Sequence, residues 1–87
     1  MASKSGRMQQ NMKTILKVLG EVPRNTSGDA YISGPQLQKK TGLSPADIND
    51  AVRLLKGEGK VELVTALGTA PYEFESVQIT PEGRLQI

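Results

Sequence analysis

The chain has no cysteine and no histidine, and this excludes several kinds of chemistry. Without these side chains it can form no disulfide, no Cys/His zinc site and no histidine-based acid–base centre. Aromatic residues are also scarce, with two tyrosines, one phenylalanine and no tryptophan. Leucine, isoleucine and valine must therefore supply most of the one small core that 87 residues can build.

Long hydrophobic runs are missing as well. Lys13 and Lys17 interrupt the apolar stretch at 12–19, so no segment suits a secretory signal or a membrane span. The sequence therefore predicts a soluble, cytoplasmic protein.

Motifs for catalysis and cofactor binding are not found. GEGK at 57–60 superficially resembles a phosphate-binding loop. A Walker A motif needs glycine at position 54 and serine or threonine at position 61, where Leu54 and Val61 stand. The carboxylates are scattered singly, so we expect no enzyme activity, no cofactor and no metal.

The net charge of +2 is distributed unevenly along the chain. Residues 1–20 carry a charge of +4, whereas residues 61–87 carry −3. A basic amino end suits weak contact with phosphate groups, and it also suits a solvated tail that aids solubility. We expect residues 1–7 to form a disordered basic tail and residues 8–87 to form the folded domain.

Apolar periodicity predicts a first helix and a following loop. Met8, Met12, Ile15, Leu16 and Leu19 form one continuous helical stripe. Gly20 is a plausible residue for the end of this helix, and the turn-forming residues 23–30 predict a loop.

Two further helices have strong start signals. Ser33 and Gln36 form a capping box for a second helix over about 35–40, which Gly42 ends. Ser44 is the N-cap of a third helix over about 45–57, and Asp47 is expected to complete its capping box. Only residues 41–43 separate the two helices, the tight turn of a helix-turn-helix.

After Gly59 the apolar period changes from 3.6 to 2, which predicts a β-hairpin over about 60–80. The return strand, 72–80, loses its alternation near Ser76, so we expect a β-bulge there. Phe74 is expected in the core, whereas Tyr72 suits either the core or, with Leu67, an apolar protein contact.

The carboxy-terminal residues predict the start of one more helix over 81–87. Thr80 is its N-cap and Pro81 its first residue, with Leu85 and Ile87 as apolar anchors.

Two motifs carry a family resemblance. ISGPQLQKKTGLSPADINDAVRLLKGEGKVEL at 32–63 and ITPEGR at 79–84 resemble the winged helix-turn-helix domains of bacterial and archaeal transcriptional regulators. The resemblance covers about residues 8–85. It implies an α+β fold with a three-helix core and a carboxy-terminal β-hairpin wing. It also implies the DNA-binding domain of a small transcriptional regulator, associated with the nucleoid.

The resemblance places the third helix in the major groove of double-stranded DNA. Ala46, Asp50 and Arg53 lie on its predicted outer face, with Asn49 beside them. Arg53 can donate to guanine, Asn49 can pair with adenine, and Asp50 can accept from cytosine. Asp50 also lies three residues before Arg53 and can pair with it.

Backbone contacts are assigned to residues near this helix and to the wing. They are Lys13, Lys17, Lys39, Lys40, Thr41, Ser44, Lys56, Gly68 and Thr69. The simpler interpretation is a solvated face for the lysines and helix capping for Ser44. About three to five phosphate contacts for each copy predict weak binding, so useful specificity needs a homodimer.

The hairpin supports an alternative function. Its segment ALGTAPYEFES at 66–76 has no basic residue and two glutamates, whereas many DNA-reading wings carry arginine or lysine at the tip. The alternative is a winged-helix protein–protein interaction module that uses this acidic hairpin, alone or as part of a larger protein. No feature singles out RNA binding.

Overall fold

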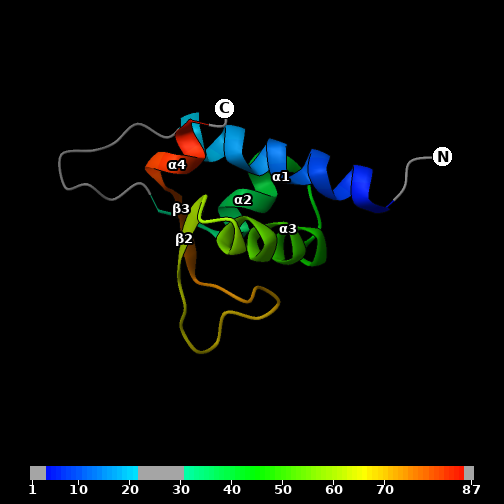
Figure 1. Ribbon diagram of the computed structural model, residues 1–87. Helices are drawn as coiled ribbons and strands as arrows, with labels where there is room; N and C mark the ends of the chain where they lie inside the picture. The colour runs from blue at the N-terminus through cyan, green and yellow to red at the C-terminus, as the bar shows by residue number, and fades with distance from the viewer. Residues whose placement is uncertain (1–3, 22–30, 86–87) are drawn as a thin grey trace.

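The computed structural model describes residues 4–21 and 31–85, which form an α+β fold (Figure 1). These residues form four helices: α1 (Lys4–Glu21), α2 (Gly34–Thr41), α3 (Pro45–Gly57) and α4 (Pro81–Arg84). Three antiparallel strands, β1 (Ile32–Ser33), β2 (Val61–Val64) and β3 (Ser76–Ile79), form a sheet in the order β1-β3-β2. Within these ranges no helix is long and apolar enough to cross a membrane.

The core lies where α1, α2, α3 and the sheet meet. The apolar stripe of α1 packs as its spacing predicts, with Ile15, Leu16 and Leu19 buried and Met8 and Met12 packed beside them. The buried face of α3 consists of Ile48, Ala51, Val52 and Leu55. Aliphatic side chains therefore make up most of the core, as the scarcity of aromatic residues predicts.

Helix α1 is longer at both ends than the sequence predicts. It begins at Lys4, so the prediction of a disordered tail over 1–7 is wrong for residues 4–7. Arg7 contributes to this extension, because its guanidinium lies 2.9 Å from the carboxylate of Asp47 on α3. At the other end the helix continues through Gly20 to Glu21. The predicted loop at 23–30 falls outside the described residues.

The capping box of α2 forms as predicted. The Ser33 hydroxyl accepts from the Gln36 backbone N–H at 3.3 Å, and the Gln36 side-chain oxygen accepts from the Ser33 N–H at 3.0 Å. Gly42 ends the helix in a left-handed conformation with φ of 74°, and its N–H donates to the Gln38 carbonyl. Only residues 42–44 then connect α2 to α3.

The amino end of α3 differs from the prediction in one respect. Ser44 is the N-cap, and its hydroxyl accepts from the Asp47 N–H at 3.2 Å. The Asp47 carboxylate does not complete a capping box; it accepts from Arg7 instead. A long arginine on the neighbouring helix offers a charged donor, which is a stronger partner than a neutral backbone N–H.

The β-hairpin is shorter than predicted and has no bulge between its described strands. Pairing runs without interruption from Val61 opposite Ile79 to Val64 opposite Ser76. Residues 65–75, called the hairpin loop below, connect the strands. The alternation of apolar residues changes near Ser76 because β3 begins there. Tyr72 and Phe74 belong to the hairpin loop, so their burial does not have to follow the two-residue period of the strand.

Helix α4 begins as predicted but ends without its expected anchor. The Thr80 hydroxyl accepts from the Gly83 N–H at 3.0 Å, as an N-cap should. Leu85 is 81% exposed, so the prediction that it anchors this helix is wrong. The helix is one turn long and ends before Leu85, which leaves that side chain in solvent. Ile87 lies outside the described residues.

Candidate nucleic-acid interface

The outer face of α3 is open to solvent over the positions that helical geometry selects. Ala46, Asp50 and Arg53 are exposed, whereas Asn49 is half-buried. Helix α3 lies between α1 and the hairpin loop, so only this face and its edges can meet a partner (Figure 1). The edge toward the hairpin loop carries most of the polar contacts described next.

Two aromatic residues fix the hairpin loop to the core. Phe74 is 1% exposed and Tyr72 is 8% exposed, and their rings meet edge to face with centroids 6.0 Å apart. The Tyr72 hydroxyl donates to the side-chain oxygen of Gln38 on α2. Its ring lies so close to Gly34 that a methyl group at that position would overlap it. Tyr72 is therefore a core residue, and the interpretation as a protein contact is wrong for it.

Asn49 joins α3 to the backbone of the hairpin loop. Its amide nitrogen donates to the Pro71 carbonyl at 2.9 Å, and its amide oxygen accepts from the Glu73 N–H at 3.0 Å. Both polar atoms of this side chain thus have partners within the chain. In this structure Asn49 positions the loop and does not present the paired donor and acceptor that adenine recognition requires.

The Arg53 guanidinium is held by two carboxylates. Its Nη2 atom donates to both oxygens of Glu73 in the hairpin loop, one of them at 2.5 Å, and its Nη1 atom lies 3.7 Å from Asp50. The pKa of Arg53 is raised, chiefly by the hydrogen bond to Glu73, then by the charges of Glu73 and Asp50. Arg53 therefore stays a cation throughout the neutral range, and its charge is offset locally.

The predicted backbone contacts fall into two groups. Lys39, Lys40 and Lys56 are exposed, and none of the described residues forms an ion pair with them. The hydroxyls are already used: Thr41 donates to the Leu37 carbonyl at 2.7 Å, and Ser44 caps α3. The three lysines are therefore the side chains here that can contact phosphate without losing an internal partner.

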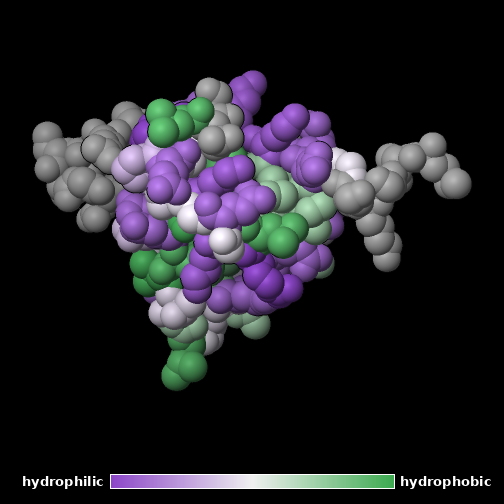
Figure 2. Space-filling model, in the orientation of Figure 1, coloured by the Kyte–Doolittle hydropathy of each residue, from purple (hydrophilic) through white to green (hydrophobic). Residues whose placement is uncertain are grey.

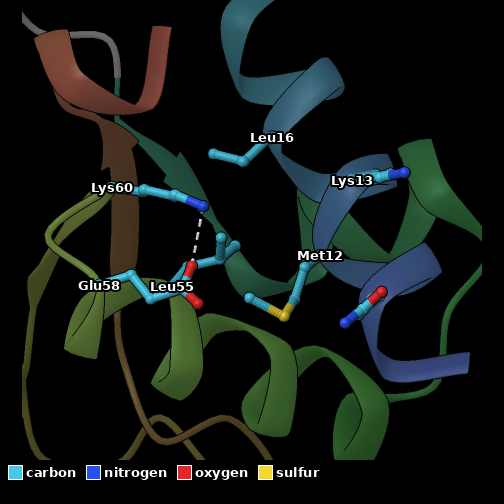
Figure 3. Close-up of a pocket in the computed structure, with 7 residues that line it drawn as sticks. Met12, Lys13, Leu16, Leu55, Glu58 and Lys60 are labelled. Carbon is cyan, nitrogen blue, oxygen red and sulfur yellow. Dashed lines mark ion pairs between the residues drawn. The ribbon is translucent and has the colours of Figure 1, made fainter. Parts of the chain in front are cut away.

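Lys13 and Lys17 lie on α1, on the other side of α3 from the hairpin loop. Lys13 lines an open groove of about 220 Å³ between α1 and α3 (Figure 3). In that view its ammonium points away from Lys60, which pairs with Glu58 across the end of the groove at 2.9 Å. Neither lysine on α1 contributes to the edge of α3 that carries Asn49 and Arg53.

The tip of the hairpin loop is apolar and open. Leu67 is fully exposed at 102%, and Figure 2 shows a hydrophobic side chain protruding at this end of the molecule beside residues of intermediate hydropathy. Gly68 is exposed, with φ of 77°. The Thr69 hydroxyl donates to the Tyr72 carbonyl at 2.9 Å, so this predicted wing contact is already used within the loop.

Sequence reasoning missed the role of Glu73. Arg53 and Glu73 are 20 positions apart, and nothing in the local sequence indicates that the two meet. Gly34, directly after the N-cap Ser33, is compatible with another residue packing closely against the backbone of α2. Nothing in the sequence identifies Tyr72 as that residue.

No family model, no curated protein and no solved structure matches the chain. Within the described ranges, no group of three or more acidic side chains could hold a metal ion.

Proposed function

We propose that the protein is a winged-helix DNA-binding domain of a small transcriptional regulator, with α3 in the major groove. One observation carries this proposal: α2 and α3 are joined by three residues, the outer face of α3 is exposed, and Lys39 and Lys40 are exposed in the last turn of α2. When two helices are joined in this way, the second can enter the major groove of DNA while the first crosses the DNA backbone. In this proposal the hairpin loop is the wing.

The exposed residues then divide into two roles. Lys39, Lys40 and Lys56 contact phosphates, because no described residue competes for their charge. Ala46 and Asp50 face the bases, where alanine suits the thymine methyl group and aspartate accepts from cytosine. Arg53 reads guanine only after its carboxylate partners release it. Asn49 supports the loop and does not read a base.

The small number of free cations predicts weak and salt-sensitive binding. Each neutralised phosphate contributes about −0.9 to the slope of log K against log salt concentration. Three lysines for each copy therefore give a slope of about −2.7 for a single domain. Two copies on a two-fold site would double this value and supply the affinity that a regulator needs.

Fluorescence anisotropy with labelled duplex DNA at several salt concentrations tests the proposal. We expect Lys39→Ala/Lys40→Ala to reduce the steepness of the salt slope by about 1.8, because two phosphate contacts are lost. The matched control is Lys13→Ala/Lys17→Ala, which removes the same charge from α1 and should change the slope little. Absence of binding at low salt, or equal losses in the two double variants, would count against α2 and α3 as the interface.

A protein-interaction module is a second candidate function, and the exposure of Leu67 favours it. A fully exposed leucine sits at the tip of a loop that carries Glu73 and Glu75 and no basic residue. Such a tip suits a partner with an apolar pocket and a basic rim. Under this alternative Leu67→Ser abolishes binding of a candidate partner, whereas under the first proposal it leaves affinity for DNA unchanged.

A further inference from the structure

We propose that Glu73 is a specificity-determining residue. It pairs with Arg53 and so prevents this arginine from contacting DNA where only phosphate groups are within its reach. This inference rests on the proposed DNA-binding function and deepens it. The Glu73 carboxylate pairs with Arg53, the one cation among the outer-face residues Ala46, Asp50 and Arg53. Arg53 then joins the interface only where the DNA offers a better partner than Glu73.

The geometry at the guanidinium explains how the carboxylate blocks base reading. An arginine can offer two parallel N–H groups either from Nη1 and Nη2 or from Nε and Nη2. Nη2 belongs to both of these pairs, and it is the atom that donates to Glu73. The Glu73 carboxylate therefore competes with guanine for either bidentate arrangement of Arg53.

The hairpin loop holds Glu73 in position for this role. Tyr72 and Phe74, its two neighbours in the chain, are both buried, and the backbone N–H of Glu73 donates to Asn49. The carboxylate is thus delivered beside Arg53 by a segment that is anchored on both sides. Little conformational freedom is lost when the ion pair forms, so it is better maintained than a pair between two free side chains.

The competition favours guanine over phosphate. The Arg53 side chain is 65% exposed. An ion pair this exposed to water favours the paired state of Arg53 and Glu73 over the unpaired state by a factor of roughly 1–5. A bidentate contact to guanine improves binding by roughly 5- to 150-fold and can displace the carboxylate. A phosphate contact is of similar strength to the Glu73 contact, so it brings little net gain.

Glu73→Gln tests this inference, with Glu75→Gln as the matched control. Both variants remove one negative charge from the hairpin loop, but no ion pair of the described residues involves Glu75. The assay is anisotropy with a random-sequence duplex over a range of salt concentrations. We expect Glu73→Gln to raise affinity about 2- to 5-fold and to steepen the salt slope by about 0.9, while Glu75→Gln leaves the slope unchanged.

A double-mutant cycle with Arg53→Ala gives a second, independent test. In the wild-type background Arg53→Ala should leave the salt slope with random DNA unchanged, because Arg53 is already occupied. In the Glu73→Gln background the same substitution should reverse the steepening. A purely structural role for Glu73 would not change the slope in this Arg53-dependent way.

The failures of the inference and of the proposed function are distinguishable. If the wild type binds duplex DNA but Glu73→Gln and Glu75→Gln behave alike, or Arg53→Ala acts equally in both backgrounds, the role of Glu73 is refuted and the DNA-binding proposal stands. If no variant binds duplex DNA at low salt, the proposed function is refuted together with the inference.

Discussion

Gly34→Ala should destabilise the fold by displacing the aromatic anchor of the hairpin loop. The new methyl group would overlap the Tyr72 ring, and a ring cannot yield as the end of a flexible side chain can. Losing the burial of such a ring costs roughly 1.5–3 kcal/mol. Losing its edge-to-face contact with Phe74 costs about 0.5–1.5 kcal/mol more.

Part of this loss is recovered locally. Gly34 is the first residue of α2, and alanine is favoured over glycine within a helix by up to about 1 kcal/mol. The net loss is therefore about 1–4.5 kcal/mol, and its lower part overlaps the usual cost of overpacking, roughly 1–3 kcal/mol. In a domain of this size each kcal/mol lowers the Tm by roughly 4–8 °C.

Urea denaturation followed by circular dichroism measures this change, and Gly57→Ala is the matched control. Gly57 is the last residue of α3, and a methyl group there meets no atom within 4 Å. We expect Gly57→Ala to be neutral or slightly stabilising. If Gly34→Ala is as stable as Gly57→Ala, the close packing of Tyr72 against α2 is refuted.

Three further substitutions, with Leu67→Ala as a control for one of them, test the parts of the structure on which the candidate interface depends. Phe74→Ala should reduce the free energy of unfolding by about 3–5 kcal/mol, whereas Leu67→Ala at the exposed tip should change it by less than about 0.5 kcal/mol; equal losses in urea denaturation would contradict the burial of the loop. Ser33→Ala removes the α2 cap and should cost about 1 kcal/mol by the same assay, and an unchanged midpoint would mean that the cap contributes nothing. Asn49→Ala removes two hydrogen bonds and should cost about 1–3 kcal/mol, with faster amide hydrogen exchange at Glu73; unchanged exchange there would show that Asn49 does not hold the loop.

Local signals in the sequence predicted the helices well. The caps at Ser33, Ser44 and Thr80 act within four residues of themselves, so their effect can be read directly from the sequence. The apolar stripe of α1 and the change of period after Gly59 also act locally. The limits of the elements were less accurate: α1 begins four residues before its apolar stripe, in a turn where Arg7 contacts the distant Asp47.

The candidate interface was predicted only in outline. Helical geometry placed Ala46, Asp50 and Arg53 on the exposed face of α3, which is a property of that segment alone. The hairpin-loop partners of Asn49 and Arg53, Pro71 and Glu73, lie at least 20 positions away along the chain. Their approach depends on how Tyr72 and Phe74 pack. Long-range packing of this kind leaves no periodic pattern in the sequence.

The most direct test of α3 as a DNA-reading helix is amide chemical-shift mapping during titration with duplex DNA at low salt. We expect the largest shifts at Ala46, Asp50 and Arg53 on the outer face of α3 and at Lys39 and Lys40 near the end of α2. Shifts confined to the tip of the hairpin loop around Leu67, or no shifts at all, would contradict the proposal that this helix reads DNA.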